Sequence, residues 1–311
     1  MTIYTGHSLL IHPDTASAVL LGGLTQVDAE VGTEVNSEET AGSPYAQNTT
    51  IRAIKPKIMA STRDIVKAIT ACGLVGLTIK GATNPGLEVW QALIENGVVK
   101  TGSFHKKIRM PEGRLMIRKI SVSHQDDAQA DLEAVALYDG SNLPFIPSTS
   151  NLPLPGTPAD PARYTLHSVS FGGVSIPCVQ SLDIDFGLTL DQFGCDSDVW
   201  DTHLLLSKIQ PIITINTLRP GQFLTTGGVP LFGLVGTHAN TVIKLRKRAT
   251  GASPFVADAT AEHISITTAG LLSIDKAFAA SGNKRGDISY RITSRFDGTN
   301  VPLIFSTTAT L

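Results

Sequence analysis

Cysteine is scarce in this sequence, and its spacing excludes two classes of small-protein architecture. The chain has three cysteines, and none of them belongs to a CxxC pair. A disulfide framework normally uses an even number of regularly spaced cysteines, and a structural zinc site uses paired ligands. Cys72, Cys178 and Cys195 fit neither pattern. We interpret them as scattered, half-buried thiols.

The sequence also lacks the short motifs that carry common enzyme chemistry. It contains no GxSxG, HExxH, Walker A or GxGxxG segment, and its eight histidines form no HxH or HxxxH pair. Carboxylate pairs such as Asp126 with Asp127 could act as acid and base, but nothing distinguishes them from surface acids. We therefore predict that the protein is not an enzyme and has no catalytic residues, bound metal or cofactor.

Charged and aromatic residues are few. Charged residues make up 17% of the chain, below the ~25% typical of soluble domains, which favours a surface partly covered by neighbouring subunits. The formal net charge of −2 gives no general attraction to nucleic acid or to an acidic membrane. The opening 24 residues have no basic start, and their apolar patches are too short for a signal peptide or a spanning helix. These features predict a soluble protein made in the cytoplasm.

What the sequence does contain is an approximate copy of itself. A chain of 311 residues exceeds the usual size of one hydrophobic core, so two domains are expected. Sliding the sequence by 155 residues aligns one block without a gap. The aligned pairs are Asp28 with Asp183, Glu30 with Asp185, Gly32 with Gly187, Tyr45 with Trp200, Ile54 with Ile209, Pro56 with Pro211, Ile58 with Ile213 and Thr62 with Thr217.

Further matches follow in the same order in both halves. GRLMIRK from Gly113 aligns with GLLSIDK from Gly270, LYDGSNLPFI aligns with RFDGTNVPLI, and GLVG begins at Gly73 and at Gly233. The conserved order predicts a tandem duplication, with a first β domain at residues 1–150 and a second at residues 165–311. Residues 151–164 are rich in proline, which fixes φ and removes amide donors, so we interpret them as a semi-rigid linker.

Acidic residues take alternate positions in two matching segments, Val27–Val35 and Leu182–Leu190 with the Asp191 that follows. Successive side chains alternate across a sheet, so each segment predicts a strand with one dry face and one wet, acidic face. The acids concerned are Asp28, Glu30, Glu34, Asp183, Asp185 and Asp191.

Helix signals are rarer. Capping candidates and a glycine stop predict a helix over Ser61–Ala71, and apolar residues at helical spacing predict another over Gly86–Asn96. The predicted fold class is mainly β, with two tandem homologous β-sandwich or barrel domains, each with a short flanking helix.

Two charged segments could form sites, although ordinary surface roles are favoured for both. Asp191, Asp196, Asp198 and Asp201 offer the oxygen ligands that calcium prefers, but they lack EF-hand spacing and fit a solvated loop. Lys244, Arg246, Lys247 and Arg248 could meet phosphates. No aromatic ladder accompanies them, so we interpret this basic run as a rim or a subunit contact.

These patterns together resemble the tail tube (major tail) proteins of long-tailed bacteriophages. The similar features are an acid-faced strand led by glycine, a strand ending in IxPxI, a short helix and a closing strand turned by Asp-Gly. The resemblance implies β-sandwich domains whose subunits join sheet to sheet into rings, and rings that stack into a DNA-conducting tube. It implies a location in the virion tail, after assembly in the host cytoplasm.

Carried onto this sequence, the resemblance makes Val27–Val35 and Leu182–Leu190 lumen-side strands, with the six acids above facing the bore. The family commonly has one tube domain per chain, whereas two are predicted here. Three chains would then supply a ring of six domains with pseudo-sixfold symmetry, and a ring of six chains is the less favoured alternative. The implied partners are further copies of the chain, other phage tail proteins, and genomic DNA that passes without specific binding. No membrane partner is expected.

Two other functions stay open at this point. A distal tail or baseplate-hub ring protein would share the tube-like fold, although an obvious host-binding insertion is not seen. A carbohydrate-binding β-sandwich module belongs to a different class. Such modules usually expose aromatic platforms, and this chain is 6% aromatic with only Trp90 and Trp200 as tryptophans.

Overall fold

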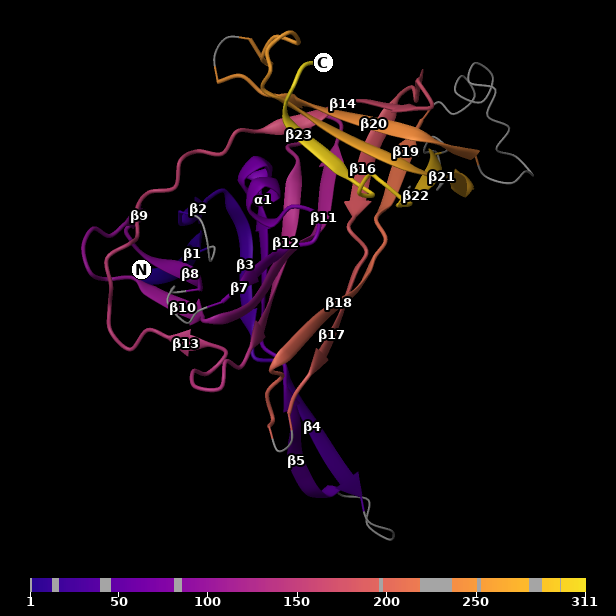
Figure 1. Ribbon diagram of the computed structural model, residues 1–311. Helices are drawn as coiled ribbons and strands as arrows, with labels where there is room; N and C mark the ends of the chain where they lie inside the picture. The colour runs from indigo at the N-terminus through magenta and orange to yellow at the C-terminus, as the bar shows by residue number, and fades with distance from the viewer. Residues whose placement is uncertain are drawn as a thin grey trace.

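The computed structural model is almost entirely antiparallel β-sheet (Figure 1). It describes residues 2–12, 17–39, 46–80, 86–195, 198–218, 237–250, 253–279, 287–296 and 298–311. Within these ranges, no helix is long and apolar enough to cross a membrane. The sheets and the single short helix of the described residues confirm the predicted mainly β class.

The smaller sheet has six strands, all from the first half of the chain. In spatial order they are β13 (Ile146–Pro147), β10 (Lys106–Met110), β8 (Leu87–Glu95), β1 (Thr2–Ile11) and β2 (Val19–Leu21), with β9 (Val98–Val99) paired to β8.

The larger sheet has thirteen strands and runs through both halves. Its main order is β15 (Val174–Ser175), β14 (Tyr164–Phe171), β20 (Thr237–Lys247), β21 (His263–Ala279), β22 (Asp287–Ser294), β19 (Ile212–Thr217), β16 (Val179–Asp185), β11 (Glu112–Ser123), β12 (Gln129–Leu137), β6 (Lys57–Thr62) and β3 (Leu24–Glu30). Two more strands pair off this path, β7 (Leu77–Ile79) with β11 and β23 (Ile304–Ala309) with β21. The two halves meet where β11 pairs with β16.

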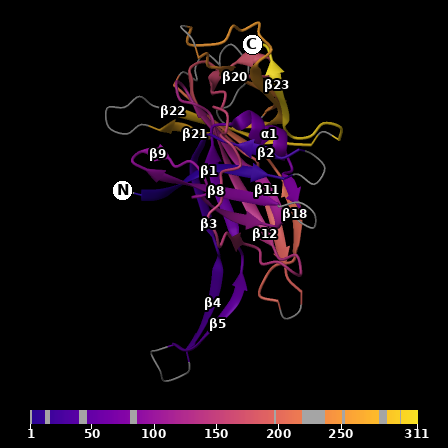
Figure 2. The same cartoon turned by 90° about the vertical axis from the view of Figure 1, so that its left-hand side faces the viewer.

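Two hairpins leave the large sheet on the same side (Figures 1 and 2). One consists of β4 (Thr33–Glu39) and β5 (Ala46–Ile54), and the other of β17 (Leu188–Phe193) and β18 (His203–Ile209). The tip loop of the second meets the base of the first, where the Ile54 amide donates to the Val199 carbonyl at 2.8 Å.

The predicted acid-faced strands are each interrupted at a glycine. Gly32 (φ 62°) and Gly187 (φ 56°) separate β3 from β4 and β16 from β17. A Cβ at Gly32 would lie 2.2 Å from the Lys55 carbonyl oxygen, and one at Gly187 would lie 2.0 Å from that of Gln210. The prediction of continuous strands over Val27–Val35 and Leu182–Leu190 was wrong, because positive φ at these glycines redirects the chain into the hairpins.

The one helix in the described residues is α1 (Ile65–Cys72), which packs its apolar face between β2 and the strands β11 and β12. It starts later than predicted, because Ser61 and Thr62 belong to β6. The Thr62 hydroxyl accepts from the Asp64 amide at 3.0 Å. Gly73 ends the helix, as expected, with its amide donating to the Ile69 carbonyl at 2.8 Å. The positions that match α1 in the second half lie outside the described residues.

The second predicted helix, Gly86–Asn96, is instead the strand β8. Its side chains are buried on both faces, and it pairs with β1 on one side and β10 on the other. A strand covered on both faces is apolar almost throughout, so Leu87, Trp90 and Ile94 fall at helical spacing without a helix. The spacing alone could not separate the two structures.

The order of strands in the first half recurs in the second. The series β11, β12, β6, β3 corresponds to β21, β22, β19, β16, and the series β13, β10, β8, β1, β2 corresponds to β23, β21, β20, β14, β15. The long strand β21 therefore corresponds to both β10 and β11, which Pro111 separates in the first half.

Local irregularities recur as well. β1 and β14 contain the matching segments YTGHS and YTLHS, a similarity that the sequence comparison missed. Both strands shift register across their histidine, between Gly6 and Ser8 and between Leu166 and Ser168. The signal was available at an offset of 160 residues, which the GLVG match from Gly73 to Gly233 shares.

Buried histidines take equivalent positions in the two halves. His105 and His263 are 1% and 0% exposed, and each Nδ1 accepts a backbone amide, from Leu93 at 3.1 Å and from Lys247 at 3.0 Å. The two halves thus share a structural histidine that no sequence motif marked.

The proline-rich segment joins the halves along the outside of the first one. Residues 148–163, all described, form no strand beyond a bridge between Leu152 and His105, whose backbones exchange hydrogen bonds of 2.9 and 3.0 Å. Asp127, at the turn between β11 and β12, pairs with Arg163 of this segment at 3.6 Å and with Arg248 at 2.7 Å. The predicted domain boundaries at 150 and 165 stay predictions, since the large sheet continues across both halves.

Candidate functional site

The strands β3 and β16 carry four of the six predicted site acids, and the sheet register places all four on one face. Directly opposite residues of an antiparallel sheet point to the same side. The pairing runs from Gln26 through Ser61, Asp131 and Lys119 to Asp185. Asp28 and Glu30 share the face of Gln26, and Asp183 shares that of Asp185, because alternate residues of a strand lie on the same side.

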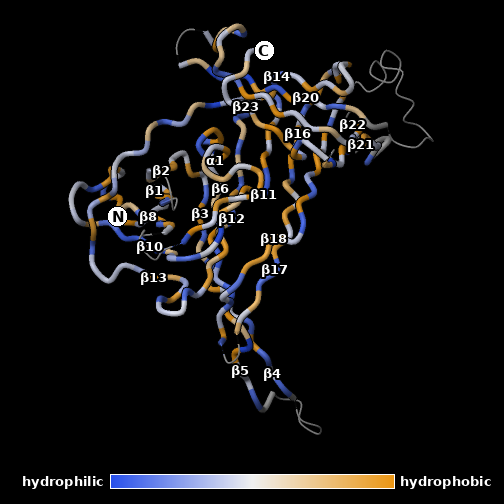
Figure 3. Tube along the Cα trace, in the orientation of Figure 1, coloured by the Kyte–Doolittle hydropathy of each residue, from blue (hydrophilic) through white to orange (hydrophobic). Residues whose placement is uncertain are grey.

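This surface, called the polar face below, is defined by Gln26, Asp28, Glu30, Ser61, Asp131, Lys119, Asp183 and Asp185. Two hollows open along it, with volumes of ≈ 440 and ≈ 450 Å³. The first is bordered by Gln26, Asp131 and Glu133, and the second by Lys119, Asp185 and Lys208. Figure 3 shows hydrophilic and hydrophobic residues alternating along the strands that carry this face.

The polar face is mixed in charge, whereas the sequence predicted a wet, acidic face. Lys57 pairs with Glu30 at 3.1 Å and Lys119 pairs with Asp183 at 3.0 Å. Arg118 pairs with Glu133 and also donates to the Leu188 carbonyl. The bases come from neighbouring strands, so the spacing within one strand could not reveal them.

The other two acids of β3 and β16 have polar rather than basic partners. Gln26 donates to Asp28 at 2.6 Å, and the Gly187 amide donates to Asp185 at 2.8 Å. Within the described ranges no lysine or arginine forms an ion pair with Asp28 or Asp185. These two carboxylates are therefore the uncompensated negative charges that β3 and β16 bring to the polar face.

Glu34 and Asp191 lie apart from that face, on the hairpin strands β4 and β17. Both are exposed. Lys55 donates to Glu34 at 2.9 Å, and this hydrogen bond together with the lysine charge lowers the pKa of the carboxyl. The sequence prediction grouped these acids with the other four because it did not foresee the breaks at Gly32 and Gly187.

The basic run at the end of β20 is engaged within the chain. Arg246 pairs with Asp258, Lys247 with Glu262 and Arg248 with Asp127. The Lys244 ammonium donates to the Thr310 carbonyl at 3.4 Å. The predicted role of Lys244, Arg246, Lys247 and Arg248 as a rim or subunit contact stays a prediction, and these contacts leave them little freedom to bind phosphates.

The cysteines do not form a site. Cys72 is buried, and burial raises the pKa of its thiol to about 12, so it stays protonated. Cys178 and Cys195 are exposed. The prediction of half-buried thiols was therefore wrong for all three, although their separation along the chain was read correctly. In the described parts of the chain, no three His, Cys, Asp or Glu residues gather as a metal site requires.

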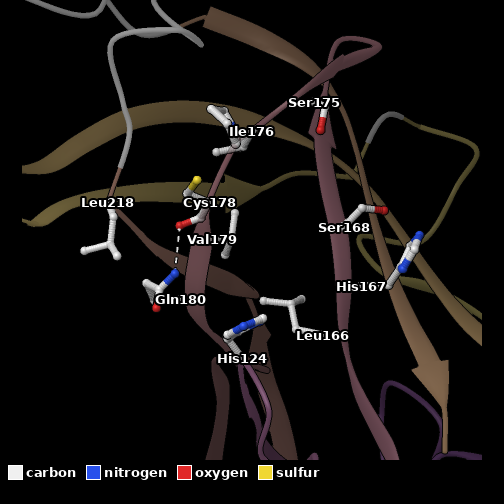
Figure 4. A pocket seen from close by; sticks show the side chains of 11 residues that line it. His124, Leu166, His167, Ser168, Ser175, Ile176, Cys178, Val179, Gln180 and Leu218 are labelled. Atoms are coloured by element: carbon white, nitrogen blue, oxygen red, sulfur yellow. Dashed lines mark hydrogen bonds between the residues drawn. The ribbon is translucent and has the colours of Figure 1, made fainter. Parts of the chain in front are cut away.

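A further hollow of ≈ 440 Å³ lies between β14 and β16 (Figure 4). His124, Leu166 and Gln180 lie in the gap between the strands, whereas His167 and Ser168 extend away from Cys178. Gln180 donates to the Cys178 carbonyl at 3.3 Å. Among the described residues, no hydrogen bond joins a histidine of this lining to Ser168 or Cys178.

The polar face is thus the most extended feature built from the predicted site residues. It spans strands of both halves. Neither a scan against protein-family models nor a search of curated proteins finds a match to this chain.

Proposed function

We propose that this protein is a tail tube subunit of a long-tailed bacteriophage, whose rings stack into a DNA-conducting tube. In this proposal the chain is a tandem duplication of one tube-type β domain and acts without catalysis. Its copies assemble in the host cytoplasm and function in the virion tail, together with other tail proteins.

The duplication is supported at the level of strands and of single residues. Both series of strands recur in order. The hairpins begin after the equivalent Gly32 and Gly187, and β1 and β14 share the register shift at a histidine. Independent folding solutions rarely reproduce bulges and positive-φ positions together, because each is a local departure from regular sheet.

The continuous polar face is the observation that carries the proposal. A tube wall requires that homologous strands of successive domains present the same side to the bore. The register from β3 to β16 meets this requirement for Asp28, Glu30, Asp183 and Asp185. Paired bases reduce the net charge, and a nearly balanced wall with a few free carboxylates suits passage of DNA without adhesion.

The pairing of β11 with β16 also supports the stoichiometry. It joins one domain to the next through different edges, which is a heterologous contact, and repetition of such a contact closes a ring or extends a filament. Three chains with two domains each give six repeats. In a ring of six chains the second domains would lie outside the ring wall. This arrangement is less favoured, because the second domains share the polar face with the first.

Negative-stain electron microscopy of the purified protein, together with its mass by light scattering, tests the proposal. Rings or hollow tubes with an axial bore, built from three chains per ring, are the expected result. A stable monomer at all accessible concentrations would refute it. Single rings that cap a tube and never stack would favour a distal tail or hub protein.

A carbohydrate-binding module gains no support from the tryptophans. Trp90 is 5% exposed and hydrogen-bonded to Glu88 at 3.0 Å. Trp200 is partly buried beside Ile54. Neither ring offers the open platform on which a sugar would stack.

A further inference from the structure

We propose that β3 of one copy pairs with the end of β21 of a second copy, in the register that β16 adopts on β11 within the chain. This inference rests on the proposed function for its ring closure, and it identifies the strands and residues that form the contact between chains.

The contact within the chain provides the template. β16 runs antiparallel to the end of β11, with Lys119 opposite Asp185 and Ile120 opposite Ile184. The Lys119 side chain forms an ion pair, at 3.0 Å, with Asp183. Asp183 is the next residue after Asp185 along the polar face. The junction thus combines backbone pairing with an ion pair that spans the two strands.

β3 is equivalent to β16 in position and in surroundings. Each is the last strand of its own series, each is followed by a glycine of positive φ and a hairpin, and each pairs with the equivalent strand, β6 or β19. The covering strands also correspond, since β1 contacts β3 as β14 contacts β16. The remaining difference is the outer neighbour, because β16 has β11 and β3 ends the sheet.

The side chains of β3 are more exposed than those of β16, as expected for a strand that lacks an outer neighbour. Leu182, Ile184 and Phe186 are each 0% exposed. At the equivalent positions Val27 is half-buried, Ala29 is exposed and Val31 is 54% exposed. Apolar side chains and unpaired backbone groups on one edge strand form a surface suited to strand addition.

β21 is equivalent to β11 at the place where the partner would bind. Both strands shift register at the same point, between Ile117 and Lys119 in β11 and between Ile274 and Lys276 in β21. On the side away from β22, the pairing of β20 with β21 ends at Leu272. Beyond that point no described residue pairs with this edge, which is the edge that β16 occupies on β11.

The template fixes the register between the two copies. Lys276 of one chain lies opposite Glu30 of the other, and Ala277 lies opposite Ala29. The sequence supplies a lysine at 276 and acids at 28 and 30, matching Lys119 and the acids at 183 and 185. The partner that fits the edge of β3 is therefore another copy of this chain, bound head to tail.

Cysteine cross-linking of the full chain tests this register. Cys178 and Cys195 are first replaced by serine, which leaves only the buried Cys72. Ala29→Cys with Ala277→Cys should then form disulfides between chains on mild oxidation, giving a ladder on non-reducing gels that ends at three chains. Directly opposite positions of antiparallel strands bring the Cβ atoms to about 4.5–5.5 Å, so a small shift of the strands reaches the roughly 3.5–4.5 Å of a disulfide.

The matched control moves one cysteine by a single residue. Glu30→Cys with Ala277→Cys places the thiols on opposite faces of the sheet and should cross-link weakly. Ala29→Cys alone tests the competing symmetric pairing of β3 with β3. Efficient dimers from that single variant would overturn the proposal.

Hydrogen–deuterium exchange of the unsubstituted protein gives a second readout that needs no variant. Amides of β3 and of residues 276–279 should exchange more slowly in the assembled protein than in chains dissociated by dilution. Rings without cross-links and without this protection would overturn the junction and leave the proposed function standing. Cross-linked closed trimers that never stack into tubes would support the junction and refute the tail tube function. A chain that stays monomeric would refute both.

Discussion

The strands β3 and β16 occupy equivalent places in the two halves, yet only β16 is buried. Phe186 stacks on Phe305 with ring centroids 5.8 Å apart. The matching Val31 and Pro147 instead border an apolar hollow of ≈ 290 Å³ beside Trp200. The comparison shows one strand pattern in two situations, enclosed within the chain in β16 and at the edge of the sheet in β3. The difference in burial between equivalent residues is therefore the basis for the contact that we propose between chains.

Reversing the charges on the polar face should have the largest functional effect. In the proposed tail tube, those particles that assemble with Asp28→Lys and Glu30→Lys, or with Asp183→Lys and Asp185→Lys, should lose infectivity steeply, because the wall would then attract DNA phosphates. The measurement is infectious titre per assembled particle. The neutral set Asp28→Asn with Glu30→Gln is the matched control and should retain far more activity. Normal infectivity of both lysine variants would remove these acids from the lumen.

Truncation at equivalent apolar positions should separate β16 from β3. Phe186→Ala should lower the free energy of unfolding by about 4 kcal/mol, because it opens a cavity at a fully buried site. Val31→Ala should cost less than about 0.5 kcal/mol in the dissociated chain, as is usual at exposed positions. Urea unfolding under dissociating conditions measures both. Equal losses would mean that β3 is already covered within one chain.

The two hairpin glycines offer a narrower comparison. Both have positive φ, and a Cβ at either would meet a carbonyl oxygen. Gly187→Ala should cost about 2 kcal/mol or more, because the left-handed conformation alone costs a side chain about 1–2 kcal/mol. Gly32→Ala should cost less, since its exposed surroundings can shift to relieve the contact. Thermal unfolding of the two variants gives the order, and a larger loss at Gly32 would contradict it.

Replacing His7 or His167, the histidines at the two register shifts, should have the smallest effect, a change in how stability depends on pH. Burial lowers the pKa of His7, and nearby His105 lowers it further. Burial likewise lowers the pKa of His167, with Arg246 contributing. The unfolded chain then binds protons more tightly than the folded chain, so stability should fall as pH drops through about 6.5. His7→Gln should flatten this dependence more than His167→Gln, because His167 is more exposed. Unchanged slopes in urea titrations at several pH values would rule out both histidines as the source.

Several features of this fold could be predicted from the sequence. The alternation of apolar and acidic residues gave the strands β3 and β16, and the order of the aligned blocks corresponds to the recurring strand order. The cap and stop signals located α1 approximately. Each of these features depends on residues that are close together in the sequence, so the sequence alone was enough to predict it.

Other features depend on contacts between distant strands and left no local signal. The apolar segment Leu87–Glu95 became a strand because β1 and β10 flank it. Lys57 and Lys119 neutralise acids on strands far from them in sequence. The continuity of the large sheet depends on the pairing of β11 with β16, which no spacing in the sequence specifies.

The pairing of β11 with β16 inside one polypeptide also has a kinetic meaning. Its two strands are tethered by the segment between residues 124 and 178, so their effective concentration is set by the chain and does not change with dilution. Contacts between chains depend on collision and respond to protein concentration. In a ring of three chains, every second junction would form as each polypeptide folds, before any encounter. Assembly would then begin from chains whose two domains are already joined. The concentration of chains would control only the other half of the junctions, those between chains.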